Sequence, residues 1–279
     1  MPCKTPRDIV SAVDGIGCAK AGLGVGRLLV LGFLAGAYIA FGGLLAVVVG
    51  GGAAGVGAGN PGLQKFIFAA VFPVGLMLVV IAGAELFTGN AATCIPAALS
   101  RRIGWGAVLR NWTLSYVGNF AGALAVAYFL TFLTGLLLKD PWMSSIVGIA
   151  EGKVSQGFLV LLLKGIGCNW LVCLAVWLAV SADDVAGKIL AIWFPIMAFV
   201  AVGFEHSVAN MYFIPTGLAL NAWENVQLPA GANAMIFNWG AFLWRNLLPV
   251  TIGNIIGGGL FVGMSYWGAY LQPQKAKSA

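Results

Sequence analysis

Two short polar stretches of the same form interrupt long apolar runs of this chain, Gly83-Ala84-Glu85-Leu86-Phe87-Thr88-Gly89-Asn90 and Gly203-Phe204-Glu205-His206-Ser207-Val208-Ala209-Asn210. Both follow the pattern G-x-E-x4-N, and a Phe-Pro pair precedes each of them, at Phe72-Pro73 and Phe194-Pro195. Glycine and proline free backbone groups that lipid cannot satisfy, so such breaks occur only where protein or a watery cavity surrounds them. The two stretches therefore predict two discontinuous membrane helices that meet inside the protein.

The composition places the whole chain in a membrane. Hydrophobic residues make up 60% of the 279 residues and charged residues only 9%, against about 25% charged residues in an ordinary soluble protein. A soluble enzyme, a nucleic-acid binder and a disordered chain are excluded, because each needs far more polar residues. The forty glycines suit a membrane bundle, since small residues let helices approach closely. The lipid bilayer is a predicted partner, and nucleic acid is not, despite the net charge of +6.

Six apolar runs are each long enough to cross a bilayer, which takes about 20 residues of helix. We expect spans at about 28–50, 66–99, 107–138, 155–180, 188–220 and 244–271. The second and fifth runs are too long for one continuous helix, and they contain the two polar stretches. The predicted fold class is an all-α integral membrane protein with six transmembrane helices, of which helices two and five are interrupted.

Basic residues are spread unevenly about these spans, with ten on the side of the N-terminus and four on the other. The ten are Lys4, Arg7, Lys20, Arg27, Arg101, Arg102, Arg110, Lys188, Lys275 and Lys277. Because cytoplasmic loops carry an excess of Lys and Arg, this predicts a multi-pass protein of the cell membrane with both termini in the cytoplasm. Residues 1–27 are expected to form an amphipathic segment on the cytoplasmic face.

Two other spans share a second pattern, R-N-x6-G-N-x2-G. It runs from Arg110 to Gly122 in the third span and from Arg245 to Gly257 in the sixth. The two patterns divide one transmembrane domain, 1–279, into repeats at about 28–138 and about 155–271, although the first and fourth spans match only weakly. Because the repeat unit has three spans, an odd number, the second copy must enter the membrane in the opposite orientation. Inverted repeats place a transport site near the midplane, where broken helices meet.

His206 is the only histidine of the chain, and it lies in the second break. Histidine is the side chain that changes charge near neutral pH, so we expect a proton donor at a central constriction; a hydrogen bond between helices is the alternative. Thr88, Asn169 and Asn254 could each bind a ligand, although interhelical hydrogen bonding is their commoner use. No metal site and no cofactor are expected, because no second histidine and no suitable cysteine cluster accompany His206.

The two glutamates of the breaks occupy matching repeat positions. A charged group in hydrocarbon is costly and needs a partner or a watery cavity. We expect Glu85 and Glu205 to cap the amides of the half-helices and, with Asn90 and Asn210, to hold the breaks in shape. Catalysis by this pair of acids is the weaker alternative.

Two lysines and three apolar residues complete the candidate pore. Lys153 either gives an outer vestibule a positive potential or is a plain surface lysine. Lys164 either lines a cavity or extends its ammonium group to the outer interface. Phe72, Leu76 and Phe199 could form apolar collars beside the central polar residues, and ordinary packing is the alternative.

Four runs of the chain resemble the signatures of the formate/nitrite transporter family, and the similarity extends along nearly its whole length. The runs are 32–43, 84–90, 203–211 and 252–259. The resemblance implies an aquaporin-like protomer of six spans, assembled as a homopentamer with a pore in each subunit. It also implies pore roles for the residues that match the family's own: His206 and Thr88 at the centre, Lys153 in the vestibule, Asn169 and Asn254 along the pore, and Phe72, Leu76 and Phe199 at the hydrophobic constrictions.

Within that family, residues 165–176 and 72–83 look closest to the formate branch associated with formate dehydrogenase. This favours formate as the substrate, with nitrite and hydrosulfide as alternatives in the same family and a water or neutral-solute channel as a different class. Lys164 has no counterpart in the best-known enterobacterial formate channels. No catalytic cluster or cofactor motif points to an enzyme.

The residues suggest a mechanism in which a small weak-acid anion enters near Lys153 and reaches an apolar collar that disfavours a bare charge. Proton transfer from the region of His206 neutralises the anion, and the acid loses its proton on the far side. The substrate and a proton are then the two species transported. Flow of the anion past a protonated, fixed His206 is the alternative.

Overall fold

The computed structural model describes residues 3–224, 235 and 237–272, and within these residues the secondary-structure elements are helices, apart from an isolated bridge between Cys3 and Ala182. Of the basic residues used to predict the orientation, Lys275 and Lys277 lie outside the described part. Six helical stretches are long and apolar enough to cross a membrane, which confirms the predicted number. They are Val25–Gly51, Pro61–Gly83, Trp105–Phe132, Phe158–Ser181, Val185–Val202 and Ala241–Tyr270.

The first, third, fourth and sixth spans are continuous. Their parts are α2 (Val25–Ala46) with the π-helical η1 (Val47–Gly51), α7 (Trp105–Ala125) with η3 (Val126–Phe132), α9 (Phe158–Ser181), and η5 (Ala241–Leu247) with α12 (Leu248–Gly258), η6 (Gly259–Met264) and α13 (Ser265–Tyr270). Shorter helices lie between or before the spans. They are α1 (Pro6–Ala21), α3 (Ala54–Gly59) and α8 (Trp142–Val154).

The second and fifth spans are interrupted, as predicted. The second consists of α4 (Pro61–Val71), α5 (Val74–Met77) and η2 (Leu78–Gly83), and after the break the chain continues as α6 (Phe87–Leu99). The fifth consists of α10 (Val185–Val202), followed after its break by α11 (Ser207–Glu224). Both breaks begin at a glycine in the left-handed region, Gly83 with φ of 88° and Gly203 with φ of 85°. A side chain would strain the backbone there, so these glycines set the point where each break begins. Of the Phe-Pro pairs, Phe72-Pro73 separates α4 from α5, whereas Pro195 lies inside α10.

Most spans begin earlier in the sequence than the apolar runs indicate, and at two of them a polar residue caps the start. The side chain of Asn60 accepts a hydrogen bond from the Leu63 amide at 3.0 Å, and α4 starts at the next residue, Pro61. The carboxylate of Asp184 accepts one from the Gly187 amide at 2.7 Å at the start of α10. Both are ordinary N-caps, so hydropathy alone placed these boundaries several residues too late.

Close helix pairs join the spans within each repeat. Helix α2 packs along α7, and α9 packs along α12 in the same way. Glycines of the repeat lie at both crossings: a Cβ added to Gly32 would lie 3.2 Å from the Gly118 Cα, and one added to Gly165 would lie 3.2 Å from the Gly253 Cα. Many of the glycines therefore serve close packing, which in a membrane replaces the hydrophobic effect as the force between helices.

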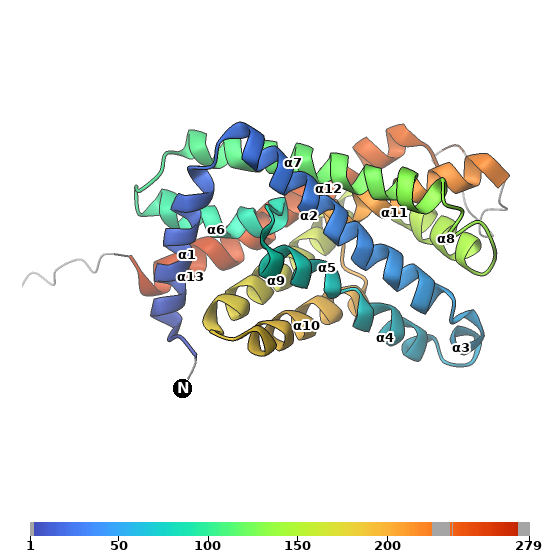
Figure 1. The fold of residues 1–279 in the computed structure, drawn as a ribbon, viewed down its shortest axis with the longest axis horizontal. Coiled ribbons are helices and arrows are strands. Elements are labelled where there is room, and N and C mark those ends of the chain that lie inside the picture. Colours follow the sequence, from blue (N-terminus) through green and yellow to red (C-terminus); the bar gives the residue numbers. More distant parts are fainter. Residues whose placement is uncertain (1–2, 225–234, 236, 273–279) are drawn as a thin grey trace, which may run out of the picture.

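The short helices α1 and α8 lie at opposite ends of the long axis of the molecule (Figure 1). Helix α1 packs against α6 and α9, while α8 packs against α11. An ion pair between Asp14 and Arg102 also ties α1 to the segment after α6, and a second ion pair joins Lys4, just before α1, to Asp183. The hydrogen bond from Arg102 to the Asp14 carboxylate, together with their attraction, raises the pKa of the Arg102 guanidinium.

Candidate functional site

Two cavities approach the centre of the bundle from its two ends. The cavity on the α8 side has a volume of about 330 Å³, and its lining includes Phe72, Lys153, Phe199, Glu205 and His206. The cavity on the α1 side has a volume of about 390 Å³, and its lining includes Lys20, Leu76, Glu85 and Asn90. The breaks of the second and fifth spans thus face the two cavities, one each.

Thr88 and His206 meet between the two breaks, although they come from different repeats. The Thr88 Oγ1 lies 2.9 Å from the His206 Nε2, and both residues are buried. The Nδ1 atom of His206 accepts a hydrogen bond from the Ala209 amide at 3.0 Å. Since a backbone N–H can only donate, Nδ1 carries no proton in this arrangement, and the neutral ring holds its proton on Nε2. The ring then donates to Thr88, whose own hydroxyl proton remains available.

Apolar side chains enclose this pair. The Phe199 ring stacks on His206 with centroids 5.9 Å apart, and Phe72 meets Phe199 edge-to-face, also at 5.9 Å. Leu76, one turn after Phe72, is buried and lines the cavity on the α1 side. Of the three residues predicted as collars, Phe72 and Phe199 therefore line the cavity on the α8 side, and Leu76 lines the cavity on the α1 side.

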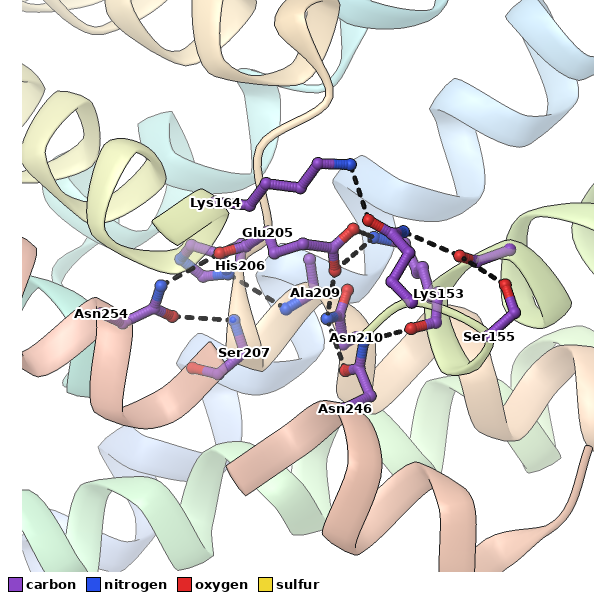
Figure 2. A network of polar contacts seen from close by, with 12 residues as sticks. Lys153, Ser155, Lys164, Glu205, His206, Ser207, Ala209, Asn210, Asn246 and Asn254 are labelled. Atoms are coloured by element: carbon purple, nitrogen blue, oxygen red, sulfur yellow. Dashed lines mark hydrogen bonds and ion pairs between the residues drawn. The ribbon is translucent and has the colours of Figure 1, made fainter. Parts of the chain in front are cut away.

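The glutamates of the breaks pair with lysines from the short helices. The Lys153 Nζ lies 3.0 Å from both carboxylate oxygens of Glu205, as Figure 2 shows. In the other repeat the Lys20 Nζ lies 2.7 Å from the Glu85 Oε1. These carboxylates also accept hydrogen bonds from the asparagines five residues later, Glu85 from Asn90 at 2.8 Å and Glu205 from Asn210 at 2.7 Å. Asn90 and Asn210 therefore lie at the breaks with the glutamates.

Asparagines, rather than the glutamates, cap the half-helices. The Asn119 Oδ1 accepts the Phe87 amide at 2.9 Å, and the Asn254 Oδ1 accepts the Ser207 amide at 2.9 Å. Each cap amide also donates to two backbone carbonyls, Asn119 to Gly32 and Glu85, and Asn254 to Gly165 and Glu205. The expectation that Glu85 and Glu205 cap these amides was wrong, because the lysines and the neighbouring asparagines already engage their carboxylates.

The pairing of Lys20 and the capping role of Asn119 were not predicted from the sequence. Asn111 and Asn246, which link the lysines to the breaks, were not predicted either. Asn111 accepts from Asn90 at 2.9 Å and donates to the Lys20 carbonyl at 3.2 Å; Asn246 accepts from Asn210 at 2.8 Å and donates to the Lys153 carbonyl at 2.8 Å. One signal for Lys20 was present: it lies twelve residues before Gly32, as Lys153 lies twelve residues before Gly165.

The two predicted pore asparagines, Asn169 and Asn254, differ in whether a polar side-chain atom remains without a hydrogen-bond partner. Both polar atoms of Asn254 serve the cap. The Asn169 Nδ2 donates to the carbonyls of Thr88 at 3.0 Å and Asn254 at 2.6 Å, while its buried Oδ1 has no hydrogen-bond partner among the described residues. Asn169 thus retains an acceptor near Thr88, and Asn254 does not.

Lys164 neither lines the cavity on the α8 side nor extends freely to an interface. Its ammonium donates to the Gln156 Oε1 at 2.7 Å, while its backbone carbonyl accepts the Glu205 amide at 3.3 Å. Figure 2 shows Lys164 beside Glu205, in the same polar network as Lys153. It lies at the edge of the break and faces a neutral partner.

Comparison with known proteins identifies the group to which this bundle belongs. A family model described as formate/nitrite transporter matches residues 7–268. The chain belongs to the formate/nitrite transporter family. The proteins of this family are transporters and channels, so this member is a multi-pass membrane transport protein and not an enzyme.

Similar proteins of this family include two named for formate. A probable formate transporter of Methanothermobacter thermautotrophicus is 49% identical, over 96% of this chain and 98% of the relative. A formate channel of Bacillus thuringiensis is 42% identical, over 95% of each. These similarities place the chain in the formate branch of the formate/nitrite transporter family.

Two solved structures of the formate/nitrite transporter family share the fold. An ion channel of the family matches with a TM-score of 0.81 and 32% identity, covering 94% of this chain and 98% of that one. A pentameric formate channel with formate bound matches with a TM-score of 0.74 and 32% identity, covering 89% and 98%. The six-span arrangement of this bundle is therefore that of the family.

Proposed function

We propose that this protein carries formate together with a proton, past the pair formed by Thr88 and His206. The observation that carries the proposal is the 2.9 Å contact between these two residues, enclosed by Phe72 and Phe199 between two cavities. A polar pair inside an apolar constriction suits a substrate that arrives as an anion and crosses as a neutral acid. The names of the similar formate transporters support formate over nitrite and hydrosulfide.

The vestibule step depends on the cavity that contains Lys153. An anion entering there meets the ammonium of Lys153 and then the rings of Phe72 and Phe199, where burial of a bare charge is strongly unfavourable. Loss of solvation raises the proton affinity of a carboxylate. Formate therefore takes up a proton from vestibule water beside His206 and crosses as formic acid.

The hydrogen bonds of His206 favour neutral transfer over a fixed cation. Because the Ala209 amide donates to Nδ1, a second proton on the ring would have to displace that hydrogen bond. A neutral ring instead orients Thr88, so that the Thr88 hydroxyl offers a hydrogen bond to the passing substrate. The side-chain Nδ2 of Asn169 donates to the Thr88 carbonyl, while its Oδ1 has no partner among the described residues. This oxygen is therefore a candidate to accept a hydrogen bond from the O–H group of formic acid.

We further propose that the protein assembles as a homopentamer in the cell membrane, with both termini in the cytoplasm. The similarity to a pentameric formate channel supports the assembly, and the excess of basic residues on the side of the N-terminus supports the orientation. With this orientation the cavity containing Lys20 opens to the cytoplasm, and the cavity containing Lys153 opens to the outside.

Flux into proteoliposomes tests the proposed function. Formate, nitrite, hydrosulfide, acetate and lactate are supplied in turn at several pH values, and empty vesicles provide the background for acids that cross lipid unaided. We expect formate to enter fastest and to acidify the lumen. Faster entry of nitrite or hydrosulfide would assign the chain to another substrate, and swelling without any anion gradient would indicate a neutral-solute channel.

A further inference from the structure

The edges of the two breaks differ by one charge at positions that the repeat relates. Lys164 directly precedes Gly165, and Leu31 directly precedes Gly32. Their backbone carbonyls accept equivalent hydrogen bonds: the Glu205 amide donates to the Lys164 carbonyl at 3.3 Å, and the Glu85 amide donates to the Leu31 carbonyl at 3.1 Å. The break of the fifth span therefore has a lysine at its edge where the break of the second span has a leucine.

Gln156, the hydrogen-bond partner of Lys164, also corresponds to an apolar residue in the first repeat. Gln156 follows Lys153 by three residues, as Leu23 follows Lys20, and both Leu23 and Leu31 line the cavity on the α1 side. The Gln156 Nε2 donates to the Gly152 carbonyl at 2.7 Å, which turns its oxygen toward Lys164. An amide is neutral, so this contact holds the ammonium group in place without cancelling its charge.

The other charges of the two breaks cancel in pairs. Lys153 is paired with Glu205, and Lys20 is paired with Glu85. The field of such a pair falls off quickly, because the opposite charges are in contact. Lys65 also lines the cavity on the α8 side, but it is exposed, where water and salt screen it. Lys164 is therefore the lysine at the edge of this break that forms no ion pair with a described carboxylate.

We propose that Lys164 is a positioning residue that concentrates the anion at the mouth containing Lys153 and makes the two mouths unequal in affinity. The inference rests on the proposed function, because it requires an anionic substrate. A single positive charge beside a low-dielectric cleft raises the local concentration of anions. It lowers the substrate concentration that half-saturates transport from that side, and it has no equivalent on the side containing Leu31.

Passive transport restricts how a difference in affinity between the two mouths appears in transport kinetics. Without a gradient, the ratio of maximal rate to half-saturating concentration must be equal for both directions. The asymmetry therefore appears as a lower half-saturating concentration, matched by a lower maximal rate, for entry from the Lys153 side. Both quantities are measured as initial formate uptake at pH 7 from each side, using vesicles sorted by a terminal tag so that all copies share one orientation.

The test replaces Lys164 by the residue of its repeat partner. K164L is expected to raise the half-saturating concentration on the Lys153 side by about two- to fivefold at low salt, an effect that shrinks at physiological ionic strength. K164R keeps the charge and is expected to keep the wild-type value. L31K adds the charge to the opposite mouth and is expected to lower the half-saturating concentration there.

The possible outcomes separate this inference from the proposed function. If wild-type vesicles take up no more formate than empty ones, the proposed function fails. If wild-type uptake is normal and K164L leaves both half-saturating concentrations unchanged, the role of Lys164 fails alone. A salt-independent loss in both K164L and K164R would likewise contradict it, because it would show a packing defect instead of a lost charge.

Discussion

The hydroxyl oxygen of Thr88 lies 2.9 Å from the Nε2 atom of His206, and the two residues belong to different repeats of the chain. Their contact joins the two breaks at the point where the two inverted halves meet. Because the Ala209 amide engages the other ring nitrogen, the contact has a direction, from the imidazole N–H to the hydroxyl oxygen.

Replacing Thr88 by valine keeps the volume and removes the hydroxyl. The buried N–H of His206 then loses its acceptor, which costs about 1–3 kcal/mol, and the substrate loses a hydrogen-bond donor. We expect formate uptake into proteoliposomes to fall about tenfold or more. T88S keeps a hydroxyl and should retain most of the activity; equal losses in both variants would contradict the role of the hydroxyl.

Phe199 is expected to limit the size of the substrate. It is 3% exposed and stacks on His206. F199A should widen the constriction and raise the uptake of lactate relative to formate severalfold, measured in the same vesicles. Phe194 on the same helix is 58% exposed, so F194A is a matched control that should keep the wild-type ratio. An unchanged ratio in F199A would show that the ring does not border the path.

Removing only one residue of the Lys153–Glu205 pair should destabilise the protein more than removing both. K153M leaves a buried carboxylate without its cation, and breaking a buried pair in this way costs about 3–5 kcal/mol. The double variant K153M/E205Q removes both charges and should recover much of the thermal stability in detergent. If the double variant melts as low as the sum of the two single variants predicts, the two residues are not coupled.

Asn119 is expected to stabilise the first break through three buried hydrogen bonds, at 2.8, 2.9 and 3.0 Å. N119A leaves the Phe87 amide unpaired and should lower the free energy of unfolding by about 2–4 kcal/mol. Asn60 caps an exposed helix start with one hydrogen bond, so N60A should cost about 1 kcal/mol or less. Thermal unfolding in detergent compares the two, and equal midpoints would count against the cap at the break.

Much of this arrangement could be predicted from the sequence, because membrane helices and their breaks have local causes. Apolar runs predict the spans, and the glycines of G-x-E-x4-N predict where two of them stop. The pattern R-N-x6-G-N-x2-G also places Asn119 and Asn254 at matching positions of the two repeats.

The partners of these residues could not be predicted in the same way. Spacing shows that Glu85 and Glu205 correspond, but not that lysines engage their carboxylates while asparagines from other spans cap the helices. Lys20 was missed because the first and fourth spans share few residues besides a lysine twelve positions before a glycine. The contact between Thr88 and His206 joins residues 118 positions apart, and only the packing of the two repeats brings them together.

The most direct test of the account measures formate uptake and lumenal pH at the same time, in wild-type vesicles and in vesicles with H206F. If formate crosses as the neutral acid, wild-type uptake acidifies the lumen by about one proton per formate, and H206F, which removes the ring N–H that orients Thr88, lowers uptake at every pH between about 5 and 8. Wild-type uptake that follows the membrane potential without acidification, or an H206F profile identical to wild type at every pH, would contradict it.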